Sequence, residues 1–167
     1  MQTIGHRTSL SPLERQVIAV MGRQAKRVSA ADAPACVAGL TIVNDVTART
    51  LQNQHKQWFL GKSPDGYCPM GPCIVTADEI PNPNALRLRT LLNGQVMQDH
   101  TTGDMIFDVP TLIESLSSTM TLRPGAVILT GTPQGVGFAR NPPVWMKPGD
   151  RVVVEIEKVG RLENPVM

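Results

Sequence analysis

The apolar residues of this chain occur in short runs that Gly and Pro interrupt, which predicts many strands joined by turns. Gln16–Met21 and Leu40–Val46 are rich in β-branched residues and predict two strands. The same pattern predicts further strands at 73–77, 86–92, 95–98, 126–130 and 151–156. Asn93 and Gly94 predict a two-residue hairpin between two of them. The pattern as a whole indicates a β-rich α+β domain.

Only short helices are expected between these strands. The segment 29–39 begins with a capping-box-like pair and predicts one short helix, and Thr47–Trp58 predicts a polar, solvent-covered one. Asp108 is a suitable N-cap for a third helix at Val109–Ser117. Gly131–Pro148 is rich in Gly and Pro and too long for a simple connection, so we expect a functional loop that becomes ordered when ligand binds.

Length and composition are those of one folded domain. The chain has 167 residues, of which 41% are hydrophobic and 18% charged, and a net charge of +2. Scattered basic residues and few aromatic ones argue against nucleic-acid binding. No stretch is long and apolar enough to be a membrane span or a signal peptide, and the three cysteines are too few for a disulfide framework. These features predict a cytoplasmic protein.

Two carboxylates stand where a hard cation could bind. Glu14 comes just before the first predicted strand and Asp45 lies near the end of the second. Residue 16 lies on the same strand face as Glu14, because strand side chains alternate, but it is Gln. Carboxylates from different elements suit a divalent cation. A plainer alternative stays open, in which Glu14 is a solvated charge and Asp45 caps the next helix.

Polar residues that could bind an oxo acid follow Asp45. Arg49 and Gln52 share one face of the predicted helix and could hold a carboxylate, although a solvated helix face is an equal alternative. Lys62 is either a surface charge or a cation fixed beside an enolate. The turn 130–133, Thr-Gly-Thr-Pro, is either an anion site or only a turn.

Other common chemistries find little support. Cys68 and Cys73 have a Cys-x4-Cys spacing that is atypical of zinc sites, and the three histidines are isolated. Neither a Gly-x-Ser-x-Gly nor a Gly-x-x-x-x-Gly-Lys motif occurs, which argues against a serine hydrolase and a P-loop enzyme.

Several motifs together resemble the fumarylacetoacetate hydrolase family from about residue 13 to the C-terminus. They are Asn-Asp-Val-Thr-Ala-Arg at 44–49, Gly-Lys-Ser at 61–63, Cys-Pro-Met-Gly-Pro at 68–72, Asp-Met-Ile-Phe at 104–107, Thr-Gly-Thr-Pro at 130–133, Lys-Pro-Gly-Asp at 147–150 and Asn-Pro-Val at 164–166. The resemblance implies a mixed β-sandwich roll with short helices over 13–167, preceded by an unmatched leader, 1–12. It also implies a homodimer.

The resemblance further implies an activity and a cofactor. Family members hydrolyse, decarboxylate or isomerise small 2-oxo and 1,3-dicarbonyl acids, often in aromatic catabolism, and usually use Mg²⁺ or Mn²⁺. A divalent cation that chelates both oxygens of a 2-oxo acid stabilises the charge that develops during such reactions. We therefore expect a metal-dependent enzyme of small oxo acids.

Position by position, the resemblance implies roles for seven residues. The metal ligands are Glu14, Gln16 and Asp45, the enolate-stabilising cation is Lys62, and the substrate-binding residues are Arg49, Gln52 and Thr132.

Two departures from the family keep an alternative open. The family's Glu-x-Glu is Glu14-Arg15-Gln16 here, so the expected metal site has lost one negative charge. The leader 1–12 does not match the family's N-terminal stretch, whose His-Glu pair activates water. The alternative is a truncated or degenerate, non-catalytic subunit that keeps the fold and the dimer surface.

Overall fold

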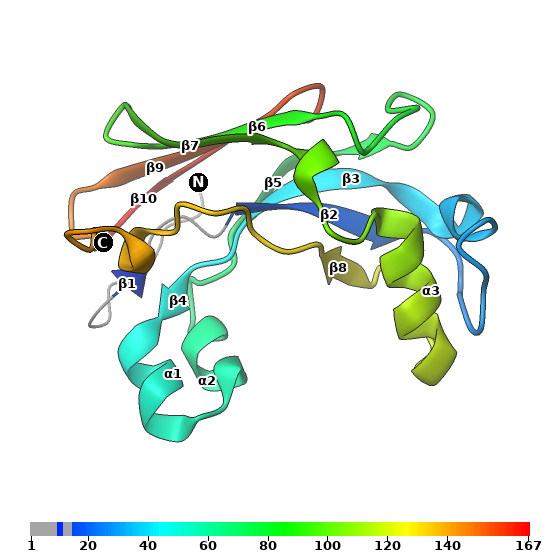
Figure 1. The fold of residues 1–167 in the computed structure, drawn as a ribbon, viewed down its shortest axis with the longest axis horizontal. Helices are drawn as coiled ribbons and strands as arrows, with labels where there is room; N and C mark the ends of the chain where they lie inside the picture. Colours follow the sequence, from blue (N-terminus) through cyan, green and yellow to red (C-terminus); the bar gives the residue numbers. More distant parts are fainter. Residues whose placement is uncertain (1–9, 12–14) are drawn as a thin grey trace.

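Two antiparallel four-stranded sheets face each other in the computed structural model, which describes residues 10–11 and 15–167 (Figure 1). A two-stranded ribbon of β1 (Leu10–Ser11) and β4 (Thr47–Ala48) stands beside them. The β-rich α+β roll predicted from the sequence is confirmed.

The first sheet has the strand order β5-β3-β2-β8. Its strands are β2 (Arg15–Met21), β3 (Val37–Asn44), β5 (Met70–Thr76) and β8 (Val127–Leu129). In the antiparallel pair of β2 and β3, Gln16 lies opposite Val43. The start of β2 and the end of β3 therefore lie at the same end of this sheet.

The second sheet has the order β10-β9-β6-β7. Its strands are β6 (Arg87–Leu92), β7 (Gln95–Thr101), β9 (Arg151–Ile156) and β10 (Gly160–Pro165). Asn93 and Gly94 join β6 to β7 with φ angles of 51° and 84°, the positive values that a tight hairpin turn of this kind requires. The predicted hairpin is confirmed.

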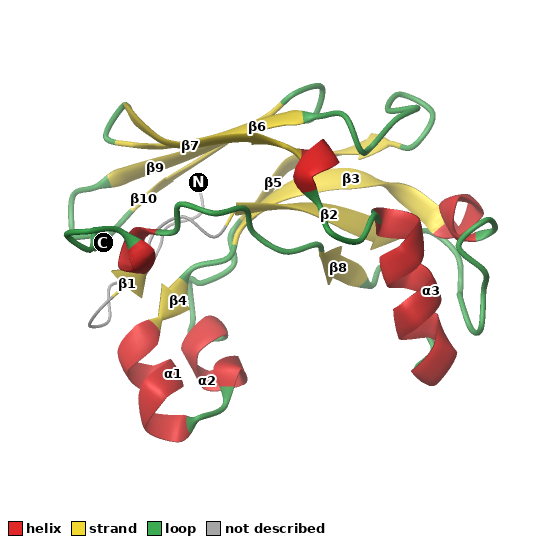
Figure 2. Ribbon diagram, viewed as in Figure 1, coloured by secondary structure: helices red, strands yellow, loops and turns green. Residues whose placement is uncertain are grey.

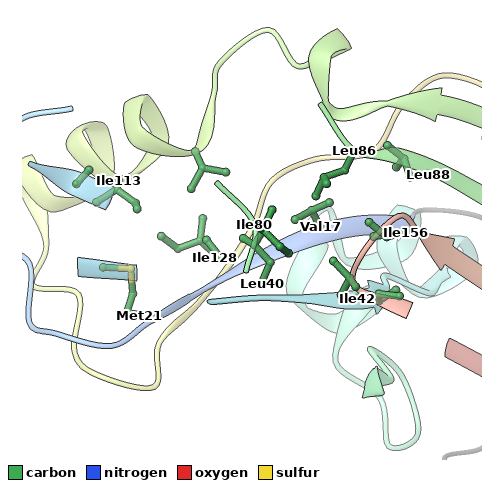
Figure 3. Close-up of a cluster of buried hydrophobic side chains, with 14 of the residues drawn as sticks. Val17, Met21, Leu40, Ile42, Ile80, Leu86, Leu88, Ile113, Ile128 and Ile156 are labelled. Carbon is green, nitrogen blue, oxygen red and sulfur yellow. The ribbon is translucent and has the colours of Figure 1, made fainter. Parts of the chain in front are cut away.

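The core fills the space between the sheets (Figure 3). Val17, Leu40 and Ile42 point inward from the first sheet, and Leu88 and Ile156 point inward from the second. Burial of these apolar side chains holds the two layers together. The sheet ends, where polar residues gather, are thereby fixed in position.

Short helices cover the ends of the sheets (Figure 2). They are α1 (Arg49–His55), α2 (Trp58–Lys62) and α3 (Val109–Thr119), with 3₁₀ turns η1 (Ala33–Cys36), η2 (Thr102–Asp104) and η3 (Gly137–Ala139). The Asp108 carboxylate caps α3 by accepting a 2.9 Å hydrogen bond from the backbone N–H of Thr111, as predicted. Within the described residues, no helix is both long and apolar enough to cross a membrane.

Three expectations for individual elements were wrong. The single helix at 47–58 is a strand followed by two helices, because Lys56 adopts a left-handed conformation with φ 55° that ends α1. The helix at 29–39 is only the 3₁₀ turn η1, which has Pro in its first turn. Strand β10 was not predicted, because its sequence, GRLENP, has no β-branched residue and no regular alternation of polar and apolar side chains.

Candidate active site

The candidate site begins where β2 starts and β3 ends. Gln16 is the second residue of β2, and Asp45 directly follows β3. Both are 5% exposed, and Gln16 Nε2 donates a 3.0 Å hydrogen bond to Asp45 Oδ2. A buried carboxylate needs such partners, because burial without them disfavours its charge. The sheet thus holds one buried negative charge at the end of its two central strands.

Lys62 brings the opposite charge to the same atom. Its Nζ lies 2.6 Å from Asp45 Oδ2 and donates a 3.1 Å hydrogen bond to Thr47 Oγ1. The Lys62 side chain as a whole is 23% exposed, so it is only partly buried. We call Gln16, Asp45, Thr47 and Lys62 the polar cluster.

Gly61 allows α2 to come close enough to place Lys62. A Cβ atom at Gly61 would lie 2.8 Å from Gln52 Cβ and 3.1 Å from the Ala48 carbonyl oxygen. These distances are shorter than ordinary van der Waals contact, so a side chain there would push α2 away from α1 and β4. Close packing therefore explains why a glycine precedes Lys62 in the Gly-Lys-Ser motif.

The Gly-rich turn after β8 is connected to the cluster through Gln16. The backbone N–H of Gly131 donates a 2.9 Å hydrogen bond to Gln16 Oε1. Gly131 has a φ of 98°, and Thr130 Oγ1 donates to the Val17 carbonyl oxygen at 2.9 Å. Thr132 is exposed at this turn, where its hydroxyl is accessible to a ligand. The structure therefore brings the turn and the polar cluster to the same end of this sheet.

Arg49 and Gln52 lie beside the cluster on α1. Arg49 Nη1 donates a 2.7 Å hydrogen bond to Gln52 Oε1, and the Phe138 ring lies under the guanidinium with Cζ 4.2 Å from its centroid. Burial lowers the pKa of Arg49 from its ordinary value, but a guanidinium remains charged at neutral pH. Gln52 is 7% exposed. The two side chains share one helix face, as the sequence predicted.

The donor set near Asp45 fits a hard cation in its chemistry. Carboxylate and amide oxygens are ligands that Mg²⁺ and Mn²⁺ accept. Gln16, however, directs its Nε2 toward Asp45 while its oxygen accepts from Gly131, so coordination requires its amide to present the oxygen instead. Glu14 lies outside the described residues. Within those residues, no three His, Cys, Asp or Glu side chains converge as a metal site.

The three cysteines do not form a zinc site with one another. Cys36 is buried, Cys73 is exposed, and all three thiols are free. Cys68 is near the polar cluster, and burial, together with the negative charge of Asp45, raises the pKa of its thiol despite the opposing effect of Lys62. This shift disfavours the thiolate, the form of cysteine that binds metal and acts as a nucleophile.

The sequence did not identify three parts of this site. Thr47 completes the polar cluster, the Gly131 N–H orients Gln16, and Phe138 stacks on Arg49. These contacts join segments far apart in the chain, so no local pattern predicts them. Thr47 and Gly131 lie inside the recognised motifs 44–49 and 130–133, but the motifs did not predict these contacts.

A family model supports the resemblance seen in the sequence. Residues 7–167 match the model described as "Fumarylacetoacetate (FAA) hydrolase C-terminal". The match starts inside the expected leader, 1–12, whose boundary stays a prediction.

Two curated relatives carry the same kind of name. "Oxaloacetate tautomerase YisK" of Bacillus subtilis is 45% identical over 159 residues, which are 95% of this chain and 53% of that protein. "Oxaloacetate tautomerase FAHD2A, mitochondrial" of Bos taurus is 46% identical over 156 residues, 92% of this chain and 50% of that protein. The chain thus spans about half the length of the curated relatives it matches.

Solved structures have the same fold. A fumarylacetoacetate hydrolase from Exiguobacterium antarcticum is 40% identical with a TM-score of 0.96, covering 99% of this chain and 61% of that one. A 2-hydroxyhepta-2,4-diene-1,7-dioate isomerase from Mycobacterium marinum is 42% identical with a TM-score of 0.88, covering 99% and 62%. The names of these relatives therefore include a tautomerase, a hydrolase and an isomerase.

Proposed function

The chain belongs to the fumarylacetoacetate hydrolase family, and we propose that it forms the catalytic part of a divalent-metal-dependent enzyme of small 2-oxo and 1,3-dicarbonyl acids. One observation carries the proposal: Lys62 Nζ lies 2.6 Å from the buried carboxylate of Asp45 and also contacts Thr47. A fixed ammonium group of this kind stabilises an enolate. Tautomerisation, isomerisation, decarboxylation and C–C bond hydrolysis of such acids share an enol or enolate.

The proposed metal ligands are Glu14, Gln16 and Asp45. Bound Mg²⁺ or Mn²⁺ supplies Lewis acidity to the oxygens of a 2-oxo acid. Asp45 holds the Lys62 side chain in place, and Lys62 keeps its proton-bearing Nζ where a substrate oxygen gains negative charge. Because that charge grows during the reaction, the attraction is stronger in the transition state than in the ground state.

Three further residues are proposed to bind the substrate. Arg49 offers a charged guanidinium and Gln52 an amide nitrogen for a carboxylate, with Arg49 and Gln52 held together by their 2.7 Å hydrogen bond. Thr132 offers a hydroxyl on the turn that Gly131 connects to Gln16. These groups orient the acid so that its 2-oxo group faces Lys62.

We propose a homodimer as the assembly. Ile74 on β5 and Val127 and Leu129 on β8 are large apolar side chains that are exposed on the two edge strands of one sheet. Exposed apolar side chains that gather on one face are typical of subunit interfaces. Light scattering on the purified protein tests the assembly, and a mass equal to the 18.1 kDa chain itself would contradict a dimer.

A specific observation also favours a second candidate, a non-catalytic subunit of this family. Gln16 donates its amide nitrogen to Asp45, and its oxygen already accepts from Gly131. These hydrogen bonds stabilise the cluster without a metal ion. A protein that keeps the fold after losing its metal carboxylate would have this appearance.

Calorimetric titration distinguishes the two candidates. The metal-stripped chain is titrated with Mg²⁺ and then Mn²⁺, and afterwards with oxalate as a mimic of a 2-oxo acid enolate. For the enzyme we expect metal binding followed by metal-dependent oxalate binding, both lost in Asp45→Ala and kept in the surface control Asp32→Ala. Enolisation of oxaloacetate, followed by ultraviolet absorbance, should need the same metal.

The opposite result has a clear form. If neither metal binds at millimolar concentrations and Gln16→Glu restores binding, the chain is the non-catalytic family member and the enzymatic proposal is wrong.

A further inference from the structure

An open pocket of about 480 Å³ lies next to the polar cluster and has an unusual lining. Three aromatic side chains from separate segments line it together with polar and basic residues of α1 and the residue after it. We call it the aromatic pocket, and its lining residues are Arg49, Gln52, Asn53, Lys56, Trp58, Phe138 and Trp145.

Aromatic residues are concentrated in this pocket. The whole chain has three Phe, two Trp and one Tyr, and both Trp and one Phe line the pocket. Trp58, Phe138 and Trp145 are 68%, 43% and 37% exposed. Large aromatic side chains that stay exposed on a soluble domain indicate a binding surface for a flat apolar group.

The aromatic pocket is one helical turn away from Lys62. Trp58 is the first residue of α2 and Lys62 the last, four positions later, so their side chains lie on one face of that helix. Four residues of α-helix rise about 6 Å. A ligand whose reacting end lies at Lys62 therefore reaches the Trp58 ring only with an arm beyond its first few carbons.

A polar anchor connects the two places. Gln52 lines the aromatic pocket, and Arg49 fixes the orientation of its amide by donating to Oε1. Gln52 Nε2 is buried and has no hydrogen-bond partner among the residues that the structure describes. An unsatisfied buried donor is costly, and a ligand oxygen would satisfy it. The carboxylate or carbonyl of a ligand is thus anchored between Lys62 and the aromatic rings.

We propose that the aromatic pocket binds a flat distal arm of the substrate, so that the preferred substrate is a 2-oxo acid with an aromatic substituent rather than a four-carbon acid such as oxaloacetate. This inference rests on the proposed function, since it takes the reacting end of the acid to lie at Lys62. The arm stacks on Trp58 and Trp145, and its length sets the specificity.

The test compares two ligands with one head group. N-methyloxamate and N-phenyloxamate both carry the 2-oxo acid mimic and differ only in the arm. Because Trp58 and Trp145 are the two tryptophans of the chain and both line the pocket, intrinsic fluorescence reports arm binding directly. Calorimetry in saturating Mg²⁺ measures the affinities, and no turnover is needed.

We expect N-phenyloxamate to bind about tenfold more tightly, which corresponds to about 1.4 kcal/mol, and to quench the fluorescence, since its ring stacks on the tryptophan rings. Trp58→Ala and Trp145→Ala should remove most of this difference and leave N-methyloxamate affinity within about twofold. Trp58→Phe and Trp145→Phe should keep the difference in affinity between the two ligands. The variant that loses the quenching shows which tryptophan the phenyl arm contacts. Phe59→Ala is the matched control, because Phe59 is the next residue of α2, is 72% exposed and does not line the pocket.

Two results would overturn the inference. If both ligands bind equally well to the unchanged protein, the pocket does not bind an arm, while the proposed function stands because the head group binds. If neither ligand binds in the presence of metal, the proposed function fails and the inference fails with it. Circular dichroism of each variant excludes misfolding as the cause of a lost difference.

Discussion

The polar cluster and the aromatic pocket are neighbours built in opposite ways. Gln16, Asp45 and Thr47 are buried, and they come from strands or residues next to strands. The aromatic pocket is made by helix ends and by a loop, and its rings remain largely exposed. Charge stabilisation needs fixed partners away from water, whereas recognition of an arm needs access. The sheet end therefore fixes the buried partners of Lys62, whereas the helices and the loop around the aromatic pocket carry the proposed specificity.

Removal of the cluster's cation should have the largest effect. Lys62→Met keeps the aliphatic length but leaves Asp45 without its ion-pair partner. We expect turnover of oxaloacetate to fall at least about 100-fold, the usual effect of removing one group that stabilises an oxyanion. N-phenyloxamate should still quench the tryptophans, because the aromatic pocket is intact.

The matched control for this change is the exposed Lys147→Met, which should keep full activity. Steady-state kinetics measure both variants. Equal activity of Lys62→Met and the unchanged protein would show that the polar cluster does not carry the proposed chemistry.

Restoration of the second carboxylate should strengthen metal binding. In Gln16→Glu the hydrogen bond from Nε2 to Asp45 is replaced by two facing carboxylates. Without metal these repel each other and the melting temperature should fall. With Mg²⁺ the affinity should rise at least about tenfold, which corresponds to about 1.4 kcal/mol.

Calorimetry and thermal melts with and without Mg²⁺ measure these opposite effects. Gln95→Glu, the same change at an exposed position of β7, is the control and should leave metal affinity unchanged. A Gln16→Glu protein that is equally stable with and without metal would remove Gln16 from the proposed ligands.

A single methyl group added at Gly61 should disturb the packing of α2, the helix that carries both Lys62 and Trp58. In Gly61→Ala the new Cβ would lie 2.8 Å from Gln52 Cβ, so α2 has to move and Lys62 and Trp58 move with it. Overpacking of this kind costs about 1–3 kcal/mol. Both turnover and N-phenyloxamate binding should weaken together, as measured by denaturant unfolding, kinetics and fluorescence.

Leu60→Ala, at an exposed neighbouring position of α2, should leave both functions nearly unchanged. If Gly61→Ala impairs only one function, the two regions are not connected through α2.

A change far from both regions should have the smallest effect. Asp108→Ala removes the cap of α3 and should lower the free energy of unfolding by about 1 kcal/mol, whereas Asp108→Asn keeps an acceptor for the Thr111 N–H. Hydrogen bonds from Thr111 lower the pKa of Asp108. The cap therefore stabilises the fold above the ordinary carboxyl pKa, and its contribution is lost as the pH falls through the lowered value.

Urea unfolding at neutral and acidic pH measures this contribution. The difference between Asp108→Ala and the unchanged protein should shrink toward acidic pH, and a difference that grows there would have the wrong sign.

Local patterns predicted the elements whose cause is local. The hairpin at Asn93 and Gly94 follows from two residues that tolerate positive φ, and the start of α3 follows from the Asp108 cap. Strand β10 and the break between α1 and α2 escaped prediction, because pairing with β9 and the left-handed Lys56 decide them. A weak local pattern is overridden by tertiary packing.

For the candidate site, the sequence by itself determined which residue types are present, and through family motifs it predicted that Asp45, Arg49, Gln52, Lys62 and Thr132 belong to one site. Only the tertiary structure decided that Lys62 shares Asp45 with Gln16, that Gly131 orients the Gln16 amide, and that Trp58, Phe138 and Trp145 form one pocket. The physical reason is that hydrogen bonds and aromatic stacking depend on distances of a few ångströms between segments up to 115 positions apart in the chain.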